Sequence, residues 1–309
     1  MEISAAQLSA LSRLFSSTVI RDLAEKGRSN LFARLMHQIG ILRNDDRLEF
    51  VRDAFEAAFD ILKEVGLRDE YIYKAALTHR ILLGRHSLRT ACMLNEFRVG
   101  SSKADIAILN GTMTVYEIKS ERDSLSRLDQ QLANYRKVFA AVFVIVGDTH
   151  VEAVLKATPS DIGVMSLSRR YQIKTLREAE NSPSRICPLT AFDTLRTKEA
   201  AEILRYLGRE VPKVPNTRIR IELRRQFENL DPEEVHVAML HTLKRTRNLL
   251  PLGDLVKKLP TSLHAAALSV PLRRGDHDRL LGAVNTPLPQ AMARSEEHTS
   301  ELQSLAYLV

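Results

Sequence analysis

The chain has 309 residues, 44% of them hydrophobic and 27% charged, which is an ordinary globular composition with enough apolar side chains for one large core or two smaller ones. Its formal net charge of +7 favours anionic partners such as nucleic acid, although a solvated basic surface without such a role is the alternative. No apolar run approaches the roughly 18 residues that a membrane-spanning helix needs, so we expect no membrane partner.

The chain carries two cysteines, Cys92 and Cys187. Two free thiols in a chain of this length indicate a reducing, cytoplasmic compartment. Cys/His spacing typical of a metal site does not occur in the sequence. The first residues, MEISAAQLSALSRLF, carry an acid at position 2 and an alternating polar face, so we expect no secretory signal there.

Helical periodicity dominates the first part of the chain. It predicts helices over residues 4–15 and 17–27. The later stretch DEYIYKAALTHRILLG predicts a further helix that stops at Gly84. We therefore predict an N-terminal helical region over residues 1–89.

The stretch NDDRLEFVRDAFEAAFDILKEVG predicts the strongest helix of this region. Asn44 can cap it, Asp45 and Asp46 lie favourably near its N-terminal dipole, and Gly66 ends it. Its apolar stripe of phenylalanine, alanine and leucine is typical of core packing.

The pattern changes after residue 90. Apolar runs with glycine punctuation predict short strands over residues 96–99, 103–109 and 112–119. SLSRLDQQLANYRKVF returns to helical spacing, AAVFVIVG resembles a strand buried on both faces, and DIGVMSLS predicts a weaker strand. The predicted order is helix–β–β–β–helix–β, a mixed α/β core over residues 90–175.

Helical patterns resume after this core. KEAAEILRYLG, TRIRIELRRQFENL and DPEEVHVAMLHTLKRTR are amphipathic, and Asp231 before Pro232 is a good helix start. We predict a C-terminal helical module over residues 190–293. RSEEHTSELQS, from Arg294, resembles the conceptual translation of a common sequencing-library adapter, so we expect residues 294–309 to be a non-native read-through tail; a natural polar tail is the alternative.

Charged residues end the apolar strand over residues 112–119. Strand alternation places Glu117 and Lys119 on the same face, and Asp105 lies one hairpin back. Burying three charges on a sheet face is costly without partners, so a divalent cation held by the two carboxylates would balance them. A structural ion pair between Glu117 and Lys119 is the alternative.

The turn between the two strands decides whether these acids meet. A plain two-residue turn at Asn110-Gly111 would put Asp105 on the face away from Glu117. A three-residue loop that begins at Leu109, with the glycine in the left-handed region, reverses that parity and makes the two acids diagonal neighbours. A metal site therefore requires an odd loop or a bulge, and we predict that Asp105 and Glu117 converge.

The residues at this strand end suggest a particular chemistry. Two carboxylates, the backbone carbonyl of Ile118 and waters would make the hard oxygen shell that Mg²⁺, or Mn²⁺ in its place, prefers. Such a metal activates a water and offsets charge on a phosphate in the transition state. Lys119 would orient that water or stabilise the pentavalent phosphate.

Asp105, followed by Glu117-x-Lys119 on the next strand between flanking helices, resembles the PD-(D/E)XK nuclease superfamily. The resemblance covers roughly residues 90–170, and the proline of the motif is absent, since Ala104 precedes Asp105. ILLGRHSL and EFRVGSSKADIAILNGTMTVYEIKSERDSL together resemble an uncharacterised bacterial branch of the superfamily. The resemblance implies a restriction-endonuclease-like core and Mg²⁺-dependent hydrolysis of DNA phosphodiester bonds.

The resemblance implies further site residues. Glu96 matches a glutamate of the preceding helix that binds a second metal or orients water, although Glu96 sits at the predicted helix–strand boundary. Gln131 and Tyr135, spaced i, i+4, match a glutamine and a tyrosine of the following helix. Gln130 competes with Gln131 for the first role, and Tyr135 is equally consistent with core packing.

Basic residues in two places are candidate nucleic-acid contacts: the loop before the core and the helix RIRIELRR. They are Arg85, His86, Arg218, Arg220 and Arg224. A solvated basic surface is the alternative for both places, and His79 is more typical of a hydrogen-bonded core histidine.

Two other functions remain open on the same fold. One is a catalytically silent nucleic-acid-binding protein that retains the site, and the other is a helical adaptor whose flanking helices mediate assembly. The intact set of Asp105, Glu117 and Lys119 argues against the adaptor and modestly against the silent protein.

Overall fold

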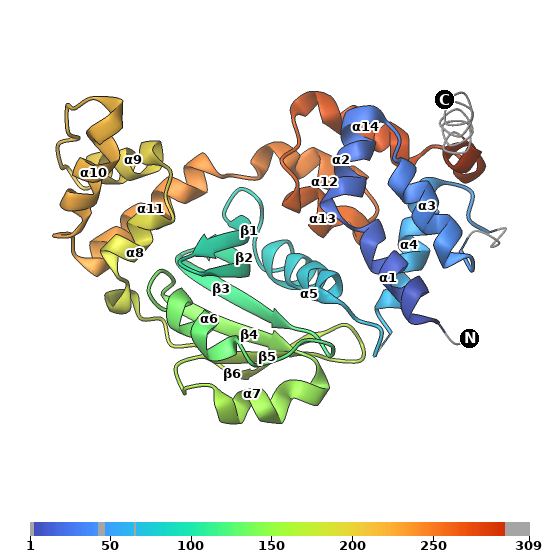
Figure 1. Cartoon of the computed structure of the whole chain (residues 1–309), viewed down its shortest axis with the longest axis horizontal. Coiled ribbons are helices and arrows are strands. Elements are labelled where there is room, and N and C mark those ends of the chain that lie inside the picture. Colours follow the sequence, from blue (N-terminus) through green and yellow to red (C-terminus); the bar gives the residue numbers. More distant parts are fainter. Residues whose placement is uncertain (1–2, 43–46, 65, 294–309) are drawn as a thin grey trace, which may run out of the picture. The chain divides into compact units, whose positions relative to one another are not determined.

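The computed structural model describes residues 3–42, 47–64 and 66–293, and these form two compact units (Figure 1). The helical unit combines the described residues up to Ala75 with those from Pro251 onward, and the sheet unit is Ala76–Leu250. This division differs from the predicted one, because residues 76–89 and 190–250 belong to the sheet unit. The predicted read-through tail, residues 294–309, lies outside the described residues.

The helical unit is assembled from the two ends of the chain, with α2 packed against α13 and α14. The predicted helices over residues 4–15 and 17–27 are confirmed, whereas α3 was not predicted. Its helices are α1 (Ala5–Leu14), α2 (Ser17–Lys26), α3 (Asn30–Ile39), α4 (Val51–Leu62), α12 (Gly253–Lys258), α13 (His264–Ser269) and α14 (Arg274–Val284). α5 (Glu70–Leu77) ends just inside the sheet unit in sequence.

α4 is shorter than the sequence predicted. Its N-cap is Phe50, whose N–H donates to the Asp53 side chain at 2.8 Å, while residues 47–50 lie outside the helix. The helix ends at Leu62 and not at Gly66. The predicted cap Asn44 and its neighbours Asp45 and Asp46 lie outside the described residues.

The sheet unit contains a six-stranded mixed sheet in the order β1-β2-β3-β4-β5-β6 (Figure 1). β1, β2 and β3 form an antiparallel meander, β4 and β5 continue parallel to β3, and β6 is antiparallel to β5. The strands are β1 (Cys92–Val99), β2 (Ser102–Asn110), β3 (Thr112–Lys119), β4 (Ala141–Val146), β5 (Gly163–Leu167) and β6 (Ile173–Arg177). The predicted α/β class, a mixed sheet flanked by helices, is confirmed.

Helices provide the crossovers that parallel strands require. α6 (Leu128–Tyr135) connects β3 to β4, and α7 (Val151–Ala157) connects β4 to β5. A π-helical turn, Thr78–Leu82, precedes β1. The predicted order of a helix, three strands, a helix and a strand is present along the chain. α7 and β6 were not predicted.

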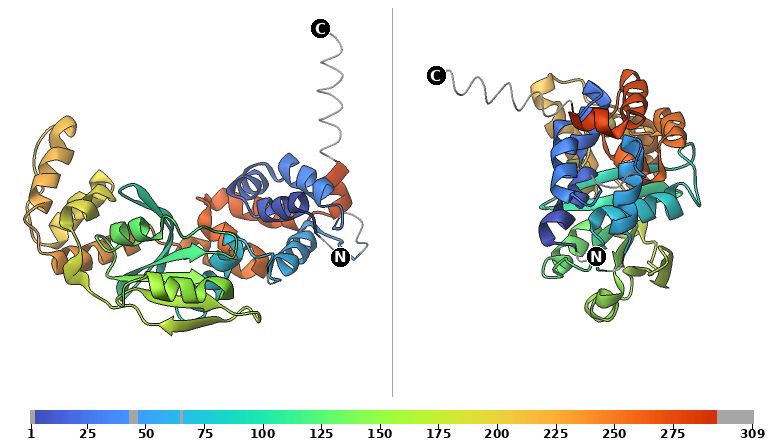
Figure 2. Two further views of the ribbon diagram at one scale, coloured as in Figure 1. Left: turned by 60° about the horizontal axis from the view of Figure 1, so that its bottom comes forward. Right: turned by 90° about the vertical axis from the view of Figure 1, so that its right-hand side faces the viewer.

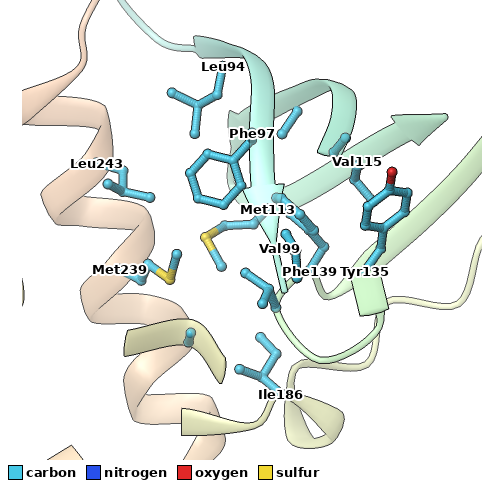
Figure 3. Close-up of a cluster of buried hydrophobic side chains, with 14 of the residues drawn as sticks. Leu94, Phe97, Val99, Met113, Val115, Tyr135, Phe139, Ile186, Met239 and Leu243 are labelled. Atoms are coloured by element: carbon cyan, nitrogen blue, oxygen red, sulfur yellow. The ribbon is translucent and has the colours of Figure 1, made fainter. Parts of the chain in front are cut away.

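The predicted C-terminal helices share the core of the sheet. Figure 3 shows Met239 and Leu243 of α11 beside Phe97 and Met113 of the sheet, within one cluster of buried side chains. The three predicted helices are α9 (Thr197–Tyr206), α10 (Asn216–Phe227) and α11 (Pro232–Thr246), and α8 (Pro188–Asp193) was not predicted. The Asp231 side chain accepts bonds from two backbone N–H groups at the start of α11, as predicted.

No helix in the described ranges is long and apolar enough to cross a membrane.

Candidate active site

The turn between β2 and β3 sets the register of the two candidate acids. Asn110 pairs with Thr112, so Gly111 alone forms the turn, with a φ of 69°. Glycine adopts this left-handed conformation at no steric cost. The connection is therefore odd, but it is one residue and not three. The pairing of Ile108 with Thr112 that a three-residue loop implies is wrong, because Ile108 lies opposite Thr114.

This register brings Asp105 to the C-terminal end of β3. Ala107 pairs with Val115, and Asp105 and Glu117 lie two residues further along their strands, so alternation places both acids on one face of the sheet. The Asp105 carboxylate also accepts a hydrogen bond from the Ile118 N–H at 2.8 Å. The Asp105 side chain on β2 thus contacts the backbone of Ile118, which lies between Glu117 and Lys119 on β3.

Glu117 and Lys119 form a buried ion pair on this face. Their side chains are 2% and 8% exposed, and Lys119 Nζ lies 2.9 Å from Glu117 Oε1. An ion pair buried to this degree requires further hydrogen bonds to offset the loss of hydration. Helix α6 supplies them.

Gln131 and Tyr135 lie one turn apart on α6 and reach Glu117 together. Gln131 Nε2 donates to Glu117 Oε1 at 2.5 Å, and Gln131 Oε1 accepts from Lys119 Nζ at 3.0 Å. The Tyr135 hydroxyl donates to Glu117 Oε2 at 2.7 Å. Gln130 instead lies 3.5 Å from Asn134, so Gln131 is the glutamine at the site.

Burial is the dominant influence on the ionisation of this network. It raises the pKa of the Glu117 carboxyl, while Lys119 and the hydrogen bonds from Tyr135 and Gln131 oppose that rise. Burial and the neighbouring Glu117 carboxylate both raise the pKa of the Tyr135 phenol, and the charge of Asp105 adds to the rise. The Tyr135 hydroxyl therefore stays protonated at neutral pH and is a hydrogen-bond donor to Glu117.

The donor set fits a divalent cation held by two carboxylates. Mg²⁺ commonly binds one or two protein carboxylates and keeps several waters. The hydrogen bonds to Glu117 from described residues occupy three of its four acceptor positions, leaving one at Oε2. The described ranges contain no group of three or more His, Cys, Asp or Glu able to hold a metal. The role of the Ile118 carbonyl as a ligand stays a prediction.

Glu96 lies inside β1, so its predicted place at a helix–strand boundary is wrong. Its backbone has a φ of 51°, which is uncommon for a residue other than glycine. Its carboxylate is 3.1 Å from Lys103 Nζ, and both side chains are more than half exposed. The structure therefore places Glu96 in a surface ion pair.

The loop before the core holds two predicted nucleic-acid contacts. Arg85 is exposed, whereas the His86 ring lies 2.6 Å from the Asn110 side chain and so contacts the β2–β3 turn. His79, predicted as a core histidine, is half-buried with Nδ1 3.4 Å from the Tyr171 hydroxyl. Of these residues Arg85 is the most open to a ligand.

Two of the three predicted arginines on α10 contact α8. The Arg220 guanidinium lies 4.6 Å from the centre of the Phe192 ring, and Arg224 lies 3.7 Å from Asp193. Arg218 is exposed. Two arginines of α10 therefore make contacts within the sheet unit, which the run of arginines in the sequence did not indicate.

The family model described as bacteriophage P4 protein cII matches residues 63–248, more than half of the chain. The chain belongs to the bacteriophage P4 protein cII family. Among the described residues, the region that matches the cII family contains strands β1 to β6 and helices α5 to α11. The Glu117 network and the helices that share its core are therefore one family domain.

Protein cII of enterobacteria phage P4 is 36% identical to this cII family chain over 98 residues, which are 31% of this chain and 33% of that protein. The chain thus spans about a third of the length of the curated relative that it matches. A solved structure of a protein of unknown function from Silicibacter pomeroyi is 19% identical, with a TM-score of 0.27, and covers 39% of this chain and 81% of that one.

Proposed function

We propose that this cII family protein is a metal-dependent nuclease of the PD-(D/E)XK type that hydrolyses DNA phosphodiester bonds. The observation that carries the proposal is the buried Glu117–Lys119 pair on the face that Asp105 shares. This is the set of side chains that the superfamily motif requires. The order of α5, the β1–β3 meander, α6 and β4 supports a restriction-endonuclease-like core.

In this proposal Asp105 and Glu117 hold Mg²⁺ or Mn²⁺. When bound, the cation lowers the pKa of a ligated water and offsets negative charge on the phosphate. Lys119, fixed between Glu117 and Gln131, presents its ammonium group to the attacking water or to a phosphate oxygen. Tyr135 holds the Glu117 carboxylate in one orientation through Oε2.

A catalytically silent nucleic-acid-binding protein on the same fold is the second candidate. The burial of Glu117, which is 1% exposed, favours it. Three donors already engage the two oxygens of this carboxylate, as in a structural ion pair. Turnover would require the network to admit a cation beside Lys119.

The two candidates differ in their response to Mg²⁺ and Mn²⁺. Supercoiled plasmid, linear duplex and branched DNA are incubated with the chain and either metal, with EDTA as the blank. The nuclease predicts cleavage that Lys119→Ala abolishes and that Lys156→Ala, a change of an exposed lysine on α7, leaves intact. DNA binding without cleavage of any substrate would refute the nuclease and support the silent protein.

A further inference from the structure

Helices α9 and α10 pack against each other in the helical part of the sheet unit (Figure 1, Figure 2). Residues of both helices line a basic cavity there. Its volume is about 710 Å³, and it is lined by the end of α9, the following loop and α10. A second hollow of about 340 Å³ shares Arg209, Glu210 and Gln226 with it. The two hollows are therefore adjacent, and together we call them the depression.

Three unpaired cations line this depression. Arg205, Arg209 and Lys213 are exposed, and none forms an ion pair or side-chain hydrogen bond with another described residue. Glu210 is the acid in the lining, so the charged side chains there sum to +2. Arg247, on the loop after α11, is by contrast bound to a buried glutamate at 2.7 Å.

The chemistry of the lining suits a phosphodiester. Guanidinium and ammonium groups donate to phosphate oxygens, and the Gln226 amide adds an uncharged donor. A positive, extended depression can follow a nucleic-acid backbone, and its volume lies within the range of ligand sites. The net positive charge of the lining gives a local field that favours the binding of an anion.

We propose that the depression lined by Arg205, Arg209, Lys213 and Gln226, which we call the basic groove, binds the phosphate backbone of DNA. The proposal rests on the proposed function for the choice of DNA. The proposal assigns DNA binding to the basic groove and not to Arg220 and Arg224, two contacts predicted from the sequence, because these two arginines pack against α8. The groove falls within residues 63–248, so it belongs to the family domain.

The test measures binding separately from cleavage. Fluorescence anisotropy of labelled duplex and single-stranded DNA is recorded in EDTA over a range of NaCl concentrations. The groove variant is Arg205→Gln/Arg209→Gln/Lys213→Gln in the full chain. The control is Lys198→Gln/Arg225→Gln/Arg245→Gln, which removes three exposed cations from α9, α10 and α11 outside the groove. Thermal unfolding verifies that both variants fold.

Each lost phosphate contact reduces duplex affinity about five-fold near 0.15 M salt, so the groove variant should lose on the order of 100-fold. The slope of log K against log salt should fall by about 2.7 for duplex and about 2 for single strands. The fold-loss of duplex affinity in the control should be several times smaller than the fold-loss in the groove variant. Equal losses in the two variants, an unchanged slope or no DNA binding by the unaltered chain would overturn the proposal.

Failure of the nuclease and failure of the basic groove are distinguishable. Binding that depends on the groove without cleavage would remove the nuclease and leave the groove. Cleavage that Lys119→Ala abolishes, in a chain whose groove variant binds DNA normally, would leave the nuclease and remove the groove. Inorganic phosphate is the probe for a small-anion site. Binding of phosphate by a chain that binds no DNA would also overturn the proposal.

Discussion

Replacing Tyr135 with phenylalanine tests whether the hydrogen bond from its hydroxyl stabilises an ionised, buried Glu117. The change removes the hydroxyl that donates to Glu117 Oε2 at 2.7 Å and leaves the buried ring in place. A hydrogen bond to a charged group contributes about 1.5–3 kcal/mol, and Glu117 is too buried for water to replace the donor freely. We therefore expect the free energy of unfolding to fall by about 1.5–3 kcal/mol at pH 8.

The cost of Tyr135→Phe should depend on pH with a definite sign. Burial raises the pKa of Glu117 in the folded chain, so the folded state binds a proton there more readily than the unfolded chain does. Stability is therefore lost as the pH rises from the unfolded pKa, about 4.3 for glutamate, through the folded pKa. Removing the Tyr135 donor raises the folded pKa further, so the variant loses more stability at pH 8 than near pH 4.

Urea unfolding at pH 4, 6 and 8 measures this dependence. Tyr116→Phe is the matched control, because Tyr116 is buried like Tyr135. Tyr116 lies on β3 and points to the face of the sheet opposite Glu117, where it stacks on Phe143. No described residue hydrogen-bonds to the Tyr116 hydroxyl, so its removal leaves no partner unsatisfied and should cost less than Tyr135→Phe. A cost for Tyr135→Phe that equals the control, or that does not change between pH 4 and 8, would refute the reasoning.

Three further predictions follow from the site and its turn. Asp105→Asn should abolish Mg²⁺-dependent plasmid nicking and the rise in melting temperature that saturating Mg²⁺ gives the unaltered chain; an equal rise in the variant would show that Asp105 holds no metal. Gln131→Leu should cost about 1–3 kcal/mol in urea unfolding, because Lys119 and Glu117 each lose a partner, whereas Gln130→Leu should be near neutral; equal costs would contradict the hydrogen bonds described. Gly111→Ala should cost about 1–2 kcal/mol in the same assay, because its φ of 69° is unfavourable for alanine, and a neutral result would mean that the turn is not left-handed.

The pattern of the sequence was sufficient for local features. Alternation along β3 placed Glu117 and Lys119 on one face, and helical spacing placed Gln131 and Tyr135 on one face of α6. Glycine at position 111 predicted a left-handed turn, which is observed. Each of these inferences depends on residues within a few positions of one another, where backbone geometry alone sets direction.

Pairings between distant residues were less predictable. The run of arginines on α10 gave no sign that Arg220 would pack on Phe192. It also gave no sign that Arg205, Arg209 and Lys213 would line one depression. The patterns likewise gave no sign that the first helices would pack with helices after residue 250. Such contacts depend on which surfaces meet, and composition and periodicity carry no information about that.

By itself, the sequence determined the helix–β–β–β–helix–β order of the core and the side of the sheet on which Glu117 and Lys119 lie, because both follow from local periodicity. Only the tertiary structure decided that a one-residue turn brings Asp105 beside Ile118, and that α6 presents Gln131, not Gln130, to Lys119. Shifting a strand register by one residue or rotating a helix slightly changes few local interactions. Either change alters the contacts between distant segments of the chain, so the packing of the whole core determines the site.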